Sequence, residues 1–182
     1  MSVEQISIEF PLVRLPRHVE ILLHETSESL EKWEGSPDQH SFVPADYVLV
    51  YDALCALRSH MPSSPRFLEW GSGLGIVTLL ASALGWKAEG VEIKSEFVQE
   101  SRYFSKQFDL PIRIHHGSFF PEEAGVIERL ADICIKSDLI YVYPWPDQEI
   151  EIFDLFDRLS RPGAFLLTYY GLEDVRVFRK HP

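Results

Sequence analysis

The chain has 182 residues, of which 46% are hydrophobic, and this length is sufficient for one domain with a sizeable core. Its 28 acidic residues outnumber its 17 basic ones, so the net charge at neutral pH is −11, and the basic residues form no cluster. Such a chain repels phosphate backbones, which speaks against a nucleic-acid partner and favours a neutral or cationic small molecule or a basic protein.

The cysteines and the apolar runs indicate the compartment. Cys55 and Cys134 lie in apolar runs without the spacing of a metal or redox motif, so we expect buried free thiols in a reducing environment. No apolar run approaches the roughly 20 residues that a membrane span needs. Residues 1–5 lack the basic and hydrophobic pattern of a signal peptide. These features predict a cytoplasmic protein without a membrane segment.

The first part of the chain, residues 1–44, is predicted to be a helical extension packed on the core. Apolar and polar residues alternate from Ile6 to Phe10, which indicates a short strand. Apolar positions from Val19 to Trp33 fit one helical face, although Val19–Leu23 could equally form a strand. A strongly amphipathic helix then runs from Pro44 to about His60 and opens the domain predicted for residues 45–182.

A glycine turn follows the first buried strand of this domain. Arg66–Trp70 is predicted to be a strand and Ile76–Leu84 a helix, with Gly71, Gly73 and Gly75 between them. Glycines let the backbone approach a ligand with no Cβ in the way, and the start of a helix presents unpaired N–H groups to it. This arrangement is typical of a nucleotide-binding βαβ unit.

The next strand, Trp86–Ile93, ends near a carboxylate. Glu92 follows Gly75 by 17 residues and closes an apolar run. A carboxylate at this place can accept hydrogen bonds from both ribose hydroxyls of an adenosine, because two acceptor oxygens match two vicinal donors.

Together these residues resemble the first two motifs of the class I S-adenosylmethionine-dependent methyltransferases. The pattern Glu-x-Gly-x-Gly-x-Gly spans Glu69–Gly75, and Glu92 precedes an apolar residue, Ile93. A nicotinamide-binding dehydrogenase is disfavoured because Ile76 stands where its third glycine belongs. The resemblance implies an S-adenosyl-L-methionine cofactor and no metal. The cofactor-binding residues that it implies are Glu69, Gly71, Ser72, Gly73, Gly75, Glu92, Ile93, Gly117, Ser118, Phe119 and Tyr141.

Two later segments depart from the family pattern. After the third strand the family often has Gly-Asp-Phe or Gly-Asp-Ala for adenine, whereas this chain has Gly117-Ser118-Phe119. After the fourth strand, amine-methylating members have Asn-Pro-Pro-Tyr or Asp-Pro-Pro-Tyr, whereas this chain has Tyr143-Pro144-Trp145-Pro146. This loop lacks the polar clamp and offers aromatic faces that attract a sulfonium or an alkylammonium. A rigid turn carrying core aromatics is the competing interpretation of the loop.

His115 and His116 form a conspicuous pair in the third strand. Adjacent residues on a strand point to opposite faces, so they cannot share one metal, and we expect structural roles.

The remaining pattern sets the fold class. Helices are predicted from Pro121 to about Ala131 and after Asp147, and strands at 164–170 and 175–180, the last pairing as an antiparallel hairpin. The predicted fold is therefore an α/β three-layer sandwich. Its twisted sheet has about six mostly parallel strands, of which the last is antiparallel, and a helical N-terminal extension. The resemblance covers about residues 66–180.

The predicted function is methyl transfer from S-adenosyl-L-methionine to an unidentified small-molecule acceptor by in-line displacement. Tyr143 is the predicted catalytic residue, facing the methyl group and the acceptor, and the sequence offers no convincing general base. The alternative is a module that binds the cofactor without catalysis.

Overall fold

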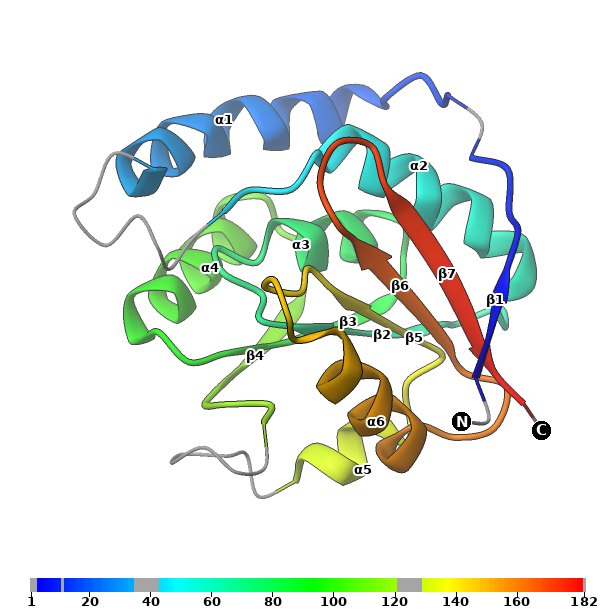
Figure 1. Cartoon of the computed structure of the whole chain (residues 1–182). Helices are drawn as coiled ribbons and strands as arrows, with labels where there is room; N and C mark the ends of the chain where they lie inside the picture. The colour runs from blue at the N-terminus through cyan, green and yellow to red at the C-terminus, as the bar shows by residue number, and fades with distance from the viewer. Residues whose placement is uncertain (1–2, 11, 35–42, 121–128, 182) are drawn as a thin grey trace.

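The computed structural model describes residues 3–10, 12–34, 43–120 and 129–181 (Figure 1). Its strands are β1 Val3–Ile6, β2 Arg66–Trp70, β3 Lys87–Glu92, β4 Ile112–His116, β5 Leu139–Val142, β6 Phe165–Tyr169 and β7 Val175–Lys180. Its helices are α1 Arg17–Glu34, α2 Tyr47–Leu57, the 3₁₀ turn η2 Arg58–His60, α3 Ile76–Ala83, α4 Ser95–Gln107, α5 Leu130–Cys134 and α6 Glu149–Leu159.

Within these residues, seven strands form one sheet in the order β1-β7-β6-β5-β2-β3-β4. The five strands from β6 to β4 are parallel to one another, while β7 is antiparallel to both of its neighbours. All five parallel strands therefore end at the same edge of the sheet, where α/β proteins of this kind bind ligands. The predicted three-layer α/β class is confirmed.

Strand residues alternate between two cores. In β5, Leu139 and Tyr141 pack with α2 and α3, whereas Ile140 and Val142 pack with α5 and α6. Helices α1 to α4 cover one face of the sheet and α5 and α6 the other (Figure 1). Both faces are buried, which explains why β5 and β6 are almost continuously apolar.

The N-terminal residues supply an edge strand as well as a helix. Strand β1 pairs antiparallel with β7, placing Ile6 opposite Val177, so the sheet has one strand more than the predicted six. Residues 19–33 are helical within α1, which resolves the two alternatives for Val19–Leu23. Most of the helix predicted from Pro121 to Ala131 lies outside the described residues. No described helix has both the length and the apolarity that a membrane crossing requires.

The turn between β6 and β7 is strained. The Asp174 N–H donates to the Gly171 carbonyl over 2.9 Å, while Leu172 and Glu173 both have positive φ, 47° and 66°. Asn-Gly suits such a turn far better than Leu-Glu. The double change Leu172→Asn and Glu173→Gly is expected to raise the free energy of unfolding by about 1 kcal/mol, measured by urea titration. An unchanged or lower unfolding free energy would show that the strain carries no cost.

Candidate active site

A cavity of about 760 Å³ opens where the parallel strands end. It is lined by residues from the turns after β2, β3, β4, β5 and β6 and from the start of α2. The structure brings to this cavity every site residue predicted from the sequence except Gly75: Glu69, Gly71, Ser72, Gly73, Glu92, Ile93, Gly117, Ser118, Phe119, Tyr141 and Tyr143.

The glycine turn has the backbone conformation that its sequence demands. Gly71, Gly73 and Gly75 have φ of 71°, 53° and 75°, values that side-chain-bearing residues rarely adopt. Gly75 is the N-cap of α3, and a Cβ there would lie 2.8 Å from the Cβ of Ser101 in α4. Gly75 thus allows the turn to pack on α4, whereas Gly71 and Gly73 lie on the cavity wall.

A further glycine, Gly90 in β3, lies directly against the glycine turn. A Cβ at Gly90 would lie 2.8 Å from the Ser72 Cβ and 2.8 Å from the Ile114 Cδ1. The Ser72 N–H also donates to the carbonyl of Val91 over 2.9 Å, which fixes the turn on this strand. The sequence prediction missed Gly90, although a glycine inside a strand signals a close backbone approach.

Glu92 connects the second strand to the glycine turn. One carboxylate oxygen accepts from the Gly73 N–H over 2.7 Å, and the other accepts from the Lys94 N–H over 2.7 Å. Burial raises the pKa of Glu92, and these backbone donors oppose the increase. The carboxylate that was predicted to hold a ribose and the turn that was predicted to hold the methionine part therefore touch each other.

Glu69 is buried at the end of β2 beside the start of α3. Its Oε2 accepts from the Thr78 N–H over 2.9 Å and from the Thr78 hydroxyl over 2.5 Å. Burial raises the pKa of Glu69 to about 8, although both Thr78 donors lower it. The raised pKa favours the neutral acid at pH 7, and the two bonds tie the side chain to the helix that follows the turn.

This raised pKa gives stability a pH dependence. Between about pH 4.5 and pH 8 the folded chain holds a proton on Glu69 that the unfolded chain has lost, so stability falls as the pH rises through this range. The loss is about 1.4 kcal/mol for each unit between the two pKa values. Urea titrations at several pH values should show a flatter profile for Glu69→Gln, and identical profiles would contradict a raised pKa.

At one end of the cavity, aromatic and small polar groups form a wall that suits a flat ring. The Phe119 ring stacks on Trp70 with centroids 5.6 Å apart and an interplanar angle of 7°. Ser118 is buried, and its hydroxyl accepts from the Phe120 N–H over 3.0 Å. Ile93 lines the same cavity and is 53% exposed, so its side chain presents an apolar surface there.

The two histidines of β4 are engaged elsewhere. His115 Nε2 lies 2.7 Å from Glu89 Oε2, and His116 Nε2 lies 3.0 Å from the Ile93 carbonyl oxygen. The hydrogen bond between His115 and Glu89 lowers the pKa of Glu89. Among the described residues, no group of three His, Cys, Asp or Glu side chains could hold a metal ion.

At the other end of the cavity, tyrosines gather on the α2 side of the sheet. The Tyr143 and Tyr169 rings meet edge to face with centroids 4.8 Å apart. The Tyr141 hydroxyl is buried and has no hydrogen-bond partner among the described residues. Burial raises the pKa of Tyr141, and nearby Glu69 raises it further. Tyr47, the first residue of α2, also lines this end.

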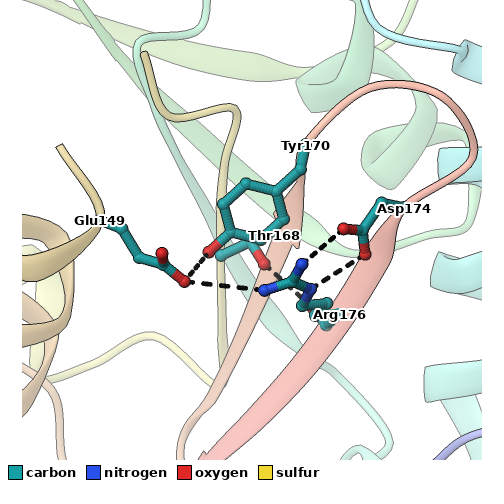
Figure 2. A network of polar contacts seen from close by, with 5 residues as sticks. All are labelled: Glu149, Thr168, Tyr170, Asp174 and Arg176. Atoms are coloured by element: carbon teal, nitrogen blue, oxygen red, sulfur yellow. Dashed lines mark hydrogen bonds and ion pairs between the residues drawn. The ribbon is translucent and has the colours of Figure 1, made fainter. Parts of the chain in front are cut away.

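Two further residues complete this end, and the sequence prediction did not identify them. Tyr170 follows β6 and Glu149 begins α6, and the Tyr170 hydroxyl donates to Glu149 Oε1 over 2.8 Å (Figure 2). Arg176 of β7 lies over the Tyr170 ring, 4.5 Å from its centroid. The place of Tyr170 directly after a parallel strand is the signal that could have identified it.

Comparisons with known proteins bear on the fold. No family model matches the chain, and no curated protein matches its sequence. A methyltransferase from Geobacter sulfurreducens has a TM-score of 0.63 at 11% identity, covering 93% of this chain and 92% of that one. An RNA methyltransferase from Salinibacter ruber, solved with S-adenosyl-L-homocysteine, has a TM-score of 0.58 at 19% identity, covering 75% and 92%.

A third structure agrees with these two. The S-adenosylmethionine-dependent methyltransferase from Thiobacillus denitrificans, also solved with S-adenosyl-L-homocysteine, has a TM-score of 0.54 at 17% identity. The match covers 86% of this chain but only 56% of that protein. Two of these three neighbours were thus solved with S-adenosyl-L-homocysteine. The chain therefore has the class I, Rossmann-like fold of the S-adenosylmethionine-dependent methyltransferases.

Proposed function

We propose that this protein is an S-adenosyl-L-methionine-dependent methyltransferase whose acceptor enters the tyrosine-rich end of the cavity. The observation that carries the proposal is the hydrogen bond from the Gly73 N–H to Glu92, inside one cavity that also contains Glu69 and Tyr143. The glycine turn and the buried Glu92 carboxylate are thus held together at the edge of the parallel sheet where proteins of this class bind ligands.

The residues present fit the cofactor by their chemistry. The Gly73 and Lys94 N–H groups donate to different oxygens of the Glu92 carboxylate, and because each oxygen has two lone pairs, both could also accept from a ribose hydroxyl. Ile93, Ser118 and Phe119 would receive the adenine, and Gly71, Ser72, Gly73 and Glu69 the methionine part. Gly75 would act indirectly, by shaping the turn. The Ser72 and Tyr141 hydroxyls are buried without a hydrogen-bond partner among the described residues, so each could bond a ligand.

The protein's contribution to the reaction would be to orient its ligands. The bound cofactor supplies an activated sulfonium methyl group, and the rate then depends on holding the acceptor atom in line at about 3 Å. Tyr143 would position the acceptor, since its ring is fixed against Tyr169. A nitrogen or sulfur acceptor that arrives deprotonated needs no general base.

Charge supports a small acceptor over a nucleic acid. Lys94 is the one basic residue among the described residues of the cavity wall, and the exposed carboxylates of Asp147 and Glu149 add negative charge to this wall. A phosphate backbone would be repelled by this wall. A cytoplasmic location belongs to the proposal as well, because Cys55 and Cys134 are both free thiols.

Two assays test this function. Calorimetric titration should show binding of S-adenosyl-L-methionine and S-adenosyl-L-homocysteine but not of a nicotinamide dinucleotide. Release of S-adenosyl-L-homocysteine should then be measured against small amines, thiols and phenols. Tight cofactor binding without turnover of any acceptor would favour the non-catalytic module, and binding of the nicotinamide dinucleotide alone would contradict the proposal.

A further inference from the structure

The acceptor end of the cavity has a distinctive chemistry, and this inference rests on the function proposed above. With the adenosine assigned to the Glu92 end, the wall that remains carries aromatic rings and acids beside a few aliphatic residues, two prolines and Gln148. We call these aromatic and acidic residues the acceptor wall, and its members are Tyr47, Tyr141, Tyr143, Trp145, Asp147, Glu149 and Tyr170. It contains no Lys, Arg or His.

The aromatic members of the acceptor wall can bind a cation. The ring of Tyr170 already does so, with the Arg176 guanidinium 4.5 Å from its centroid. Trp145 is 42% exposed in the loop after β5, so part of its indole is open to a ligand. Tryptophan and tyrosine faces are the aromatic surfaces that attract an ammonium group most strongly.

The acidic members add a net negative charge. Glu149 Oε1 lies 3.8 Å from an Arg176 nitrogen, but the same guanidinium makes two shorter bonds to Asp174, of 3.0 and 2.6 Å (Figure 2). Arg176 is therefore matched chiefly by Asp174, and the charge of Glu149 persists at the cavity rim. Asp147, exposed in the same loop, adds a second carboxylate.

A third feature points to a ligand with N–H groups. Tyr141 is 2% exposed and is one of the residues that line the cavity, and its buried hydroxyl has no hydrogen-bond partner among the described residues. Its oxygen can accept from an N–H of an incoming nitrogen whose lone pair faces the methyl group. A buried hydroxyl without a partner is costly, so a ligand that pairs with it gains affinity.

We propose that the acceptor is an aliphatic amine, attracted to this wall as its ammonium form. The ammonium loses one proton to water, and the lone pair of the neutral amine attacks the methyl carbon. The carbon–sulfur bond breaks with its electron pair going to sulfur, so the products are a methylated ammonium, neutral S-adenosyl-L-homocysteine and the released proton. A carboxylate or phosphate acceptor would be repelled by the same groups.

An isosteric pair of probes tests the recognition of charge directly. With S-adenosyl-L-homocysteine bound, choline should bind roughly tenfold more tightly than 3,3-dimethylbutan-1-ol, which has the same shape without the charge. Glu149→Gln should weaken choline binding roughly fivefold, because the amide oxygen still accepts from Tyr170 while the charge is lost. Glu151→Gln on the same helix, outside the cavity wall, should leave it unchanged.

Turnover then tests the acceptor and its source. Release of S-adenosyl-L-homocysteine is expected with n-butylamine or with a lysine-containing tripeptide amide that is acetylated only at its N-terminus, so that the lysine side-chain amine is free. Faster turnover of n-butylamine would identify the acceptor as a free amine, and faster turnover of the peptide would identify it as a protein side chain. Equal binding of choline and its neutral isostere, or turnover of thiols or phenols but of neither amine, would overturn this inference and leave the cofactor site standing. Failure to bind S-adenosyl-L-homocysteine would instead overturn the proposed function and this inference with it.

Discussion

Glu92→Gln is expected to weaken the binding of S-adenosyl-L-homocysteine by about 3 kcal/mol, or roughly a hundredfold, in a calorimetric titration. The carboxylate holds the N–H groups of Gly73 and Lys94, each over 2.7 Å. An amide offers one acceptor oxygen and places N–H donors against the second backbone donor. The substitution would therefore remove the charge-assisted bonds that we propose between Glu92 and the ribose, and it would also loosen the turn.

A variant of the same strand provides the matched control for Glu92. Glu89→Gln changes a carboxylate that pairs with His115 and does not line the cavity. It should lower stability slightly and leave the cofactor affinity within twofold of the parent. An unchanged dissociation constant in Glu92→Gln would remove this residue from the cofactor site.

Gly90→Val is expected to abolish measurable cofactor binding. The new Cβ would lie 2.8 Å from Ser72 and 2.8 Å from Ile114, closer than real Cβ contacts approach, so the turn must shift. Because Ser72 belongs to the same turn as Gly73, the shift also breaks the geometry of the bond to Glu92. We expect a loss of unfolding free energy of about 2 kcal/mol from overpacking, measured by urea titration.

Gly85 provides a control that separates a loss of stability from a loss of cofactor binding. At Gly85, φ is 81° and nothing lies within 4 Å of an added Cβ. Gly85→Ala should therefore lower stability by about 1 kcal/mol through backbone strain and keep full cofactor affinity. If Gly90→Val bound the cofactor as tightly as Gly85→Ala does, the support of the turn by Gly90 would be disproved.

The parts of the site that could be predicted from the sequence are local. The turn glycines could be predicted to have positive φ because glycine is the residue that adopts this conformation most readily. Glu92 follows them at a spacing that is typical of the βαβ unit. Strands β5 and β6 could be predicted because burial on both faces makes them almost continuously apolar.

The parts that could not be predicted depend on distant partners. Strand β1 lies at the sheet edge because it pairs with β7, which is at the other end of the chain. The hydrogen bond between Tyr170 and Glu149 likewise joins residues from two different turns, and the sequence of neither turn indicates that they are partners. Gly90 could be noticed in the sequence, but only the packed structure shows that Ser72 presses on it.

A crystal structure with S-adenosyl-L-homocysteine bound tests the central claim most directly. We expect both ribose hydroxyls within hydrogen-bond distance of the Glu92 carboxylate, the sulfur facing Tyr143, and the glycine turn against the methionine part. A ligand bound elsewhere, or bound here with its ribose away from Glu92, would contradict the account.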